Sequence, residues 1–195
     1  GDNYNHTKIE AEKLAIRYYL EKKLPVVILR PPYIYGPRDR QLLPRVLKYL
    51  KNGQYKYIDG GNNPFSLVYV GNLVDAMVRA ATAEKAVGQI YHITDGENVT
   101  RRQLIELICD ILGYKKPTKS IPLGVARKVA WLLETINKIF GIKTPPLLNR
   151  FRIKFMYTYL TFNISKAKRD LGYAPRPFAV CMKETLEWYK KEGSV

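Results

Sequence analysis

The sequence predicts an α/β fold with a parallel sheet, and three observations support this prediction. Residues 3–22 place Ile9, Leu14 and Ile16 among charged side chains with the period of a helix. The run Val26–Leu29 is too short for a helix and consists of branched apolar residues, which is typical of a strand buried on both faces of a parallel sheet. Helical and strand-like stretches then alternate along the rest of the chain.

The later elements follow from apolar periodicity and from residues that begin or end helices. Glycine or proline follows most of the expected helices, because glycine adopts the left-handed conformation that ends a helix and proline cannot continue one. The expected elements are a helix over 41–52 ended by Gly53, strands at 55–58 and 67–70, a helix from 70 to about 86 with Asn72 as N-cap, a strand at 88–94, a helix capped by Thr100 and ended by Gly113, helices over 122–140 and 149–157, a short helix capped by Ser165 and ended by Gly172, and a terminal helix over 178–191.

Composition excludes several classes of protein. With 195 residues, of which 46% are hydrophobic and 12% aromatic, the chain is long enough and apolar enough for a packed core. Cys109 and Cys181 are too few for a disulfide framework, and His6 and His92 lack metal-ligand spacing, so we expect no metal site. His92 is interpreted as a structural residue. The sequence shows no signal peptide and no apolar stretch of about 18 residues, so we expect a cytoplasmic protein without a membrane span.

Tyr4 and Lys8 are the first candidate catalytic pair. They stand four residues apart in the expected first helix, so both side chains project from one face. An ammonium beside a phenol favours the phenolate, which makes the tyrosine usable as an acid or base near neutral pH. The same spacing recurs at Tyr18 and Lys22, so the pair is informative only in combination with the elements that come after it in the chain.

Those elements are the remainder of the helix, an apolar strand and the loop Arg30-Pro31-Pro32-Tyr33-Ile34-Tyr35-Gly36-Pro37-Arg38. In this order the sequence resembles the extended short-chain dehydrogenase/reductase family, which includes nucleotide-sugar epimerases and 3β-hydroxysteroid dehydrogenases. The resemblance implies the C-terminal part of a Rossmann-type doubly wound parallel sheet, with a smaller and mostly helical substrate-binding region. It also implies that Tyr4 is the catalytic acid/base, that Lys8 binds the nicotinamide ribose of NAD or NADP and tunes Tyr4, and that a loop lies against the nicotinamide, namely Pro31, Pro32, Tyr33 and Ile34.

The second half of the chain carries the same resemblance. The stretch from Pro122 to Phe151, with Pro145-Pro146-Leu147-Leu148 inside it, is similar to the 3β-hydroxysteroid dehydrogenase branch, and 161–173 is similar to a family-wide signature. Asn72 stands where the family usually has an acid, whereas Asp75 is retained. The resemblance implies a small-molecule substrate. It would be a secondary alcohol or ketone, and it would be sterol-like or another bulky apolar molecule.

The chain lacks the family's Gly-rich turn and the strand–helix half that should precede Tyr4. We therefore expect the C-terminal part of a longer protein, without its N-terminal nucleotide-binding half, and inactive by itself. Residues 1–100 would complete the Rossmann-like domain, with substrate-side segments at about 40–66, and 101–195 would form mainly the substrate-binding region. The residue that distinguishes NAD from NADP would lie in the absent half. A homodimer is also considered.

Two alternative functions stay open. A nucleotide-sugar epimerase or dehydratase would need arginines for a pyrophosphate, and Arg38, Arg40 and Arg45 are the candidate substrate-binding residues. A basic module that binds nucleic acid or a membrane without catalysis would explain the formal net charge of +16. No helix-turn-helix, zinc or RNA-binding signature accompanies that charge, which makes nucleic acid an unfavoured partner.

The positive charge is concentrated between Asp110 and Asp170, where Glu134 is the one acidic residue in the sequence. In the same region the expected helix over 122–140 has an apolar stripe, predicted as Leu123, Ala126, Val129, Leu133, Ile136 and Phe140. The stripe either packs as a lid over an apolar substrate or lies in a membrane interface. In the second case the protein would be peripheral to the membrane.

Overall fold

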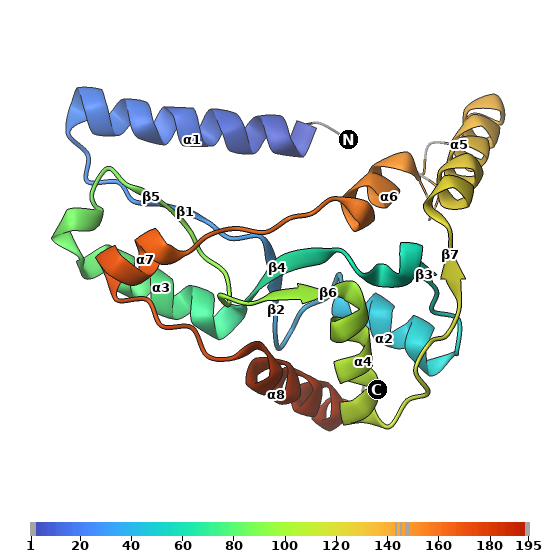
Figure 1. Ribbon diagram of the computed structural model, residues 1–195. Helices are drawn as coiled ribbons and strands as arrows, with labels where there is room; N and C mark the ends of the chain where they lie inside the picture. Colours follow the sequence, from blue (N-terminus) through green and yellow to red (C-terminus); the bar gives the residue numbers. More distant parts are fainter. Residues whose placement is uncertain (1–2, 143, 145, 147–148, 194–195) are drawn as a thin grey trace. The chain divides into compact units, whose positions relative to one another are not determined.

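The computed structural model describes residues 3–142, 144, 146 and 149–193 (Figure 1). It is a mixed α/β structure in which three pairs of strands run parallel, as the sequence predicts. Pro145, Leu147 and Leu148 of the proline–leucine motif lie outside the described residues. The elements are α1 (Asn3–Lys22), β1 (Ile28–Arg30), β2 (Tyr33–Tyr35), α2 (Leu43–Lys51), β3 (Tyr57–Ile58), η1 (Asp59–Gly61), β4 (Pro64–Tyr69), α3 (Val70–Thr82), η2 (Glu84–Ala86), β5 (Ile90–His92), β6 (Asn98–Thr100), α4 (Arg101–Leu112), β7 (Ser120–Ile121), α5 (Leu123–Ile139), α6 (Arg150–Tyr157), α7 (Ser165–Leu171) and α8 (Phe178–Lys191).

The chain divides into two compact units. Unit 1 comprises Gly1–Arg38, Ser66–Asn98 and Phe162–Thr185, and unit 2 comprises Asp39–Phe65, Val99–Thr161 and Leu186–Val195. Each unit is therefore built from segments that are distant in sequence.

Unit 1 is a layered α/β structure. β1 pairs with β5 in parallel, with Ile28 opposite Ile90, and β2 pairs with β4 in parallel. Figure 1 shows α1 on one side of β1 and β5, with α3 and α7 on the other side. The core packs helix residues against strand residues, which is the usual way in which a parallel sheet buries its faces. Its buried members are Val68, Leu73, Ala76, Ala80, Ala86, Tyr91, Ile93, Ile164, Ala167, Leu171 and Tyr173.

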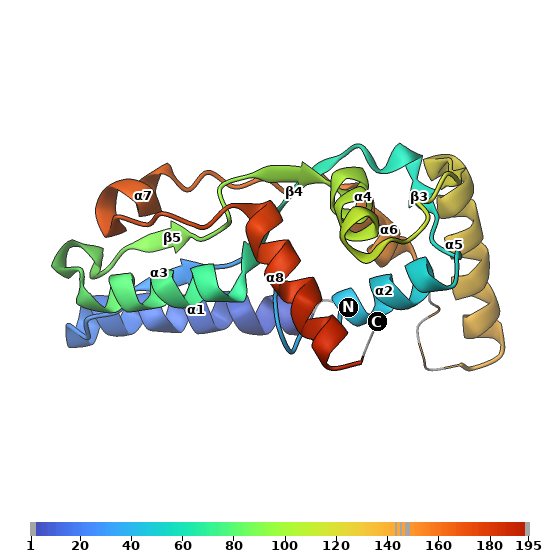
Figure 2. The same cartoon turned by 90° about the horizontal axis from the view of Figure 1, so that it is seen from below.

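Unit 2 is mainly helical, with the short parallel pair β3 and β7. One of its clusters contains Ile58, Ala126, Ala130 and Ile153, so α5 and α6 pack together beside β3. Figure 2 shows α6 next to α5. Among the residues that the structure describes, no helix combines the length and the apolar character needed to cross a membrane.

Several predicted boundaries are confirmed. Thr100 caps α4 by accepting a hydrogen bond from the Gln103 backbone, and the Gln103 side chain accepts one from the Thr100 backbone. Gly113 and Gly172 adopt the left-handed conformation after α4 and α7. Each of these helix boundaries depends on residues only a few positions away, so the sequence alone predicts it.

Two predicted helix caps are wrong. Asn72 lies inside α3, which begins at Val70. Its buried side-chain amide does not cap the helix, because it forms hydrogen bonds with Asp95 and Arg176. Ser165 is the first residue of α7, and the Asn163 side chain accepts the hydrogen bond from the Ser165 backbone. In both cases the preference of Asn and Ser for N-cap positions does not tell whether the side chain bonds to the start of the helix or to another group.

Two burial predictions also need correction. Val26–Leu29 is half-buried, because β1 pairs with β5 alone among the described strands. In α5, Ala126 and Ala130 are fully buried, whereas Val129, Ile136 and Phe140 of the predicted stripe are exposed. The helix itself is confirmed, but small side chains form its packed face.

Candidate active site

Helix α1 brings Tyr4 and Lys8 together. The Lys8 ammonium nitrogen lies 5.6 Å from the centroid of the Tyr4 ring, one helical turn away. The Thr7 hydroxyl donates a 2.7 Å hydrogen bond to the Tyr4 carbonyl at this end of the helix. Tyr4 is 69% exposed, so its hydroxyl is accessible to a ligand. The structure thus brings the two predicted side chains together, and their catalytic roles stay a prediction.

An ion pair ties α1 to the sheet. The Arg30 guanidinium at the end of β1 donates a 2.9 Å hydrogen bond to Glu12 of α1 and also contacts the second carboxylate oxygen. The hydrogen bond from Arg30 lowers the pKa of Glu12 below its ordinary value. Local sequence patterns predict no partner for either residue, since the contact spans 18 positions. This pair positions the helix that carries Tyr4 relative to the strand that leads into the predicted loop.

His92 lies beside this ion pair. It is opposite Arg30 in the β1–β5 register, and its ring stacks on Phe162 with centroids 4.7 Å apart. Burial, followed by the nearby Arg30 charge, lowers the pKa of His92. These surroundings support a neutral packing residue, in line with the structural interpretation.

The loop that contains Pro31, Pro32, Tyr33 and Ile34 is held firmly at its far end. Tyr33 and Ile34 belong to β2, and they pair in register with Leu67 and Val68 of β4. Gly36 has φ of +150°, and a Cβ at this position would come 2.5 Å from Cγ1 of Val70. Only glycine fits there without displacement. The loop is thus fixed while Ile34 remains 44% exposed, which leaves an apolar side chain accessible to a ligand.

A buried carboxylate anchors the strand residue that follows this loop. The Tyr35 hydroxyl donates a 2.8 Å hydrogen bond to Asp95, whose other oxygen accepts from the Tyr69 backbone and the Asn72 amide, each at 2.8 Å. Asp95 is 4% exposed, and burial raises its pKa. Burial also raises the pKa of Tyr35. Three donors satisfy the acid, so we assign it a structural role.

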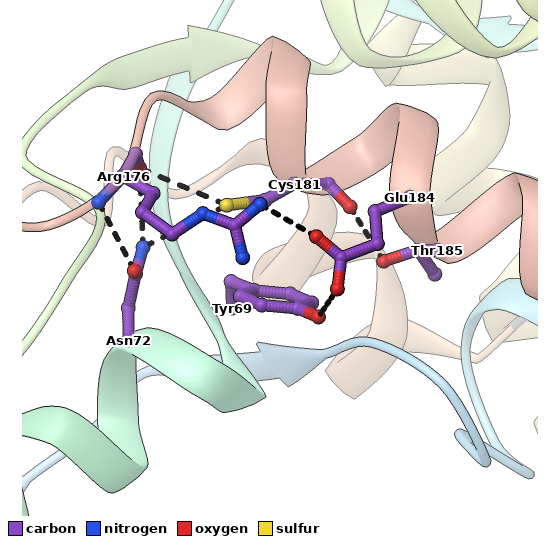
Figure 3. A network of polar contacts seen from close by, with 6 residues as sticks. All are labelled: Tyr69, Asn72, Arg176, Cys181, Glu184 and Thr185. Carbon is purple, nitrogen blue, oxygen red and sulfur yellow. Dashed lines mark hydrogen bonds and ion pairs between the residues drawn. The ribbon is translucent and has the colours of Figure 1, made fainter.

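The same network continues to α8 (Figure 3). The Asn72 amide bonds to both backbone groups of Arg176, at 3.0 and 3.1 Å. The Arg176 guanidinium contacts Glu184 at 2.6 Å, and the Tyr69 hydroxyl donates to the other Glu184 oxygen at 2.8 Å. Burial and the bond to Glu184 raise the pKa of Tyr69 to about 12. Local sequence patterns give no signal for this network, because Asn72 and Tyr69 lie about a hundred positions from their partners.

The three predicted substrate-binding arginines are all exposed. Arg38 belongs to unit 1 and has φ of +68°, a conformation that is uncommon for a side chain other than glycine. Arg40 and Arg45 belong to unit 2. Their joint role in binding a substrate stays a prediction.

An open pocket of about 440 Å³ lies elsewhere in unit 1, lined in part by Asp95, Glu97, Lys168 and Tyr173. None of the predicted catalytic or cofactor-binding residues lines it. Asp95 and Tyr173 already bond within the protein, through Tyr35 and the Thr94 carbonyl respectively. We therefore do not place the reaction there.

Comparison with known proteins supports the predicted family resemblance. The model of the 3-beta hydroxysteroid dehydrogenase/isomerase family matches residues 1–123. Short-chain dehydrogenase/reductase family 42E member 1 of Xenopus laevis is 33% identical over 206 residues, covering 98% of this chain and 53% of the relative. The 3beta-hydroxysteroid-dehydrogenase/decarboxylase isoform 2 of Arabidopsis thaliana is 35% identical over 186 residues, covering 90% of this chain and 33% of the relative. The chain thus spans about half the length of the first relative and a third of the second.

Solved structures show the same fold. The crystal structure of gox2253 superposes with a TM-score of 0.75 at 27% identity, covering 98% of this chain and 57% of that one. UDP-glucuronic acid 4-epimerase from Bacillus cereus, solved in complex with NAD, gives 0.69 at 20% identity, covering 97% and 52%. The predicted Rossmann-type α/β class is confirmed by this likeness.

Proposed function

The chain belongs to the 3-beta hydroxysteroid dehydrogenase/isomerase family, and we propose that the protein containing it is an NAD(P)-dependent oxidoreductase that interconverts a secondary alcohol and a ketone. The observation that carries this proposal is the position of the Lys8 ammonium 5.6 Å from the Tyr4 ring, on an exposed helix face. The wider group is the extended short-chain dehydrogenase/reductase superfamily, to which the named relatives and the solved neighbours also point.

In the proposed reaction Tyr4 handles the proton. During oxidation the alcohol hydroxyl gives its proton to the Tyr4 phenolate while the carbon loses a hydride, and during reduction the proton returns. Lys8 stabilises the phenolate by its positive charge. A removed acid/base group of this kind typically costs a factor of roughly 10² to 10⁴ in rate.

The residues present fit a nicotinamide cofactor. When bound, the nicotinamide supplies or accepts the hydride. Lys8 offers three donors for ribose hydroxyls, and the fixed loop offers the exposed Ile34 as an apolar contact for the ring. Pro31 and Pro32 add stiffness to the loop, since proline fixes the backbone angle φ. Either NAD or NADP is compatible with these groups.

We propose a sterol-like or other bulky apolar substrate. The support is membership of the family, together with 35% identity to a plant protein named as a 3beta-hydroxysteroid dehydrogenase/decarboxylase. Activity is expected only when the chain is joined to a nucleotide-binding half, because its sequence contains no Gly-rich strand–turn–helix. Pairing with a second copy stays a prediction.

The second candidate is a nucleotide-sugar epimerase or dehydratase. It is favoured by the structural likeness to an epimerase and by the exposed guanidinium groups of Arg38, Arg40 and Arg45, which suit a pyrophosphate. Against it stands the family match, which is to steroid dehydrogenases. The third possibility, a basic module without catalysis, leaves the arrangement of Tyr4 and Lys8 unexplained.

A substrate panel separates the two enzymatic candidates. A polypeptide carrying both halves would be incubated with NAD or NADP and with 3β-hydroxysterols or nucleotide sugars, and reduced nicotinamide would be followed by absorbance. We expect net reduction of the cofactor with a hydroxysterol. Conversion of a nucleotide sugar without net reduction, together with no turnover of any sterol, would instead establish the epimerase.

A further inference from the structure

The turn of α1 that carries Tyr4 and Lys8 has little packing to hold it. Of the α1 side chains that the structure describes, none is buried, and those of residues 4–11 are all exposed. The half-buried side chains recur every three or four residues, so they lie on one helix face. They are Glu12, Ala15, Ile16 and Tyr19. Glu12 is therefore the half-buried residue nearest to the proposed catalytic pair.

Arg30 ties Glu12 to the sheet. Its guanidinium donates a 2.9 Å hydrogen bond to one Glu12 carboxylate oxygen and also contacts the other oxygen. A two-point contact between an arginine and a carboxylate fixes orientation as well as distance. The main chain of Arg30 is fixed in turn, because its carbonyl accepts a hydrogen bond from the N–H of Ile93, whose side chain is fully buried. Both partners of the ion pair belong to unit 1.

The ion pair joins the two parts of the proposed cofactor site. On the helix, Tyr4, Lys8 and Glu12 succeed one another at intervals of four residues, so they lie along one side of α1. On the strand, Arg30 is followed directly by Pro31, where the predicted nicotinamide loop begins. A shift of α1 along β1 would therefore change the distance between the Tyr4 hydroxyl and this loop.

We propose that Glu12 and Arg30 are positioning residues for the proposed reaction, and that their ion pair sets the placement of Tyr4 and Lys8 relative to the cofactor loop. This inference rests on the proposed function. Neither residue exchanges the proton or the hydride, and both act through the helix and the strand that they connect. Misplacing reacting groups by about 1 Å can lower a rate by a factor on the order of 10².

The pair should affect the rate rather than the stability of the fold. Its side chains are 27% exposed at Glu12 and 44% exposed at Arg30. Ion pairs with this much contact with water contribute little to the free energy of unfolding. A merely structural role would instead lower the melting temperature together with the rate.

The test measures kcat and the melting temperature of E12A, R30M and the exchanged pair E12R/R30E in a polypeptide that carries both halves. Each single variant should lower kcat at least about tenfold. The exchanged pair should exceed both single variants, because it restores an arginine–carboxylate contact between α1 and β1. The melting temperatures of the single variants should stay within about 3 °C of the parent value.

The matched control is E10A. Glu10 pairs with Lys13 at 2.8 Å, and both side chains are exposed on α1. The control thus removes an ion pair of the same helix that does not reach the strand, and kcat should keep the parent value.

Hydrogen exchange of the same polypeptide without cofactor gives a readout that does not depend on activity. The amides of residues 4–11 should exchange at least about threefold faster in E12A and R30M than in the parent, because the helix loses its tether to β1. They should change less in E10A.

Three results would overturn the proposal. The first is a parent kcat in E12A and R30M. The second is an equal loss of kcat in E10A, because α1 would then need its charges in general. The third is unchanged exchange of residues 4–11 in both single variants. Tyr4→Phe in the same assay separates these from failure of the proposed function: an inactive Tyr4→Phe beside a fully active E12A removes the positioning role alone, whereas an active Tyr4→Phe removes both.

Discussion

The side-chain amide of Asn72 pairs with both main-chain groups of Arg176, accepting from its N–H at 3.0 Å and donating to its carbonyl at 3.1 Å. The same amide nitrogen donates to Asp95 at 2.8 Å. Asn72 is 3% exposed, so water cannot replace these bonds. One residue thus connects α3, the carboxylate that anchors the predicted cofactor loop and the segment that leads into α8.

Replacing Asn72 by alanine should therefore destabilise the protein. The buried Asp95 carboxylate and the Arg176 N–H would each lose a partner, and we expect the free energy of unfolding to fall by about 2 kcal/mol. Urea denaturation followed by circular dichroism measures this change. Val74→Ala, at an exposed position of the same helix, should change it by less than about 0.5 kcal/mol. Equal losses in the two variants would contradict the assigned role of Asn72.

Glu184 should make stability depend on pH in the acid range. Hydrogen bonds from Tyr69 and then Arg176 lower its pKa in the folded protein. A lowered folded-state pKa means that the carboxylate stabilises the fold above the unfolded value of about 4.3, and that this contribution is lost as pH falls through the folded value. The parent should be more stable than Glu184→Gln near neutral pH, and the two should converge in acid. A difference that is constant between neutral and strongly acid pH would argue against the pair.

The capping box of α4 gives a third prediction. Thr100→Ala removes the hydroxyl that accepts from the Gln103 backbone at 3.1 Å, and the expected cost is about 1 kcal/mol in the free energy of unfolding. Thr82→Ala is a suitable control, because the Thr82 hydroxyl is exposed and bonds to carbonyls of its own helix. Thermal unfolding of both variants checks this, and an unchanged melting temperature for Thr100→Ala would refute it.

Such local features are the part of the fold that sequence could predict. The Thr100 cap, the glycine after α4 and the period of α1 depend on neighbours a few positions away. Tyr4 and Lys8 meet for the same reason, since one helical turn separates them. The order of elements around that pair then led to the family, which the match over residues 1–123 confirms.

Contacts between distant residues could not be predicted. Asn72 favours an N-cap by local preference, yet its partners are 23 and 104 positions away. The periods of helices and strands do not predict the Glu12–Arg30 pair either, because its members lie 18 positions apart in different elements. In α5 the apolar period predicted the helix but not its whole buried face, because Ala126 of the predicted stripe packs together with Ala130, whereas Val129, Ile136 and Phe140 are exposed. The structural role of Asp95 could not be predicted, because a single acidic residue after a strand does not indicate which groups it will bind.

A prediction for Lys8 separates it from a similar pair on the same helix. In a polypeptide that carries both halves, Lys8→Ala should weaken cofactor binding and lower kcat, because the cofactor ribose loses a donor and Tyr4 loses its cationic neighbour. Lys22→Ala, four residues after Tyr18, should do neither. Cofactor fluorescence titration and initial rates at saturating cofactor measure both effects. Similar effects at the two lysines would mean that α1 requires positive charge in general.

The most direct test of the proposed function is turnover by Tyr4→Phe in the same polypeptide. The substitution removes only the hydroxyl that exchanges the proton and leaves the ring beside Lys8. We predict a fall in kcat of at least about 10²-fold with cofactor affinity nearly unchanged, while Tyr18→Phe keeps full activity. A Tyr4→Phe enzyme that retains the parent rate would contradict the assignment of Tyr4 as the acid/base.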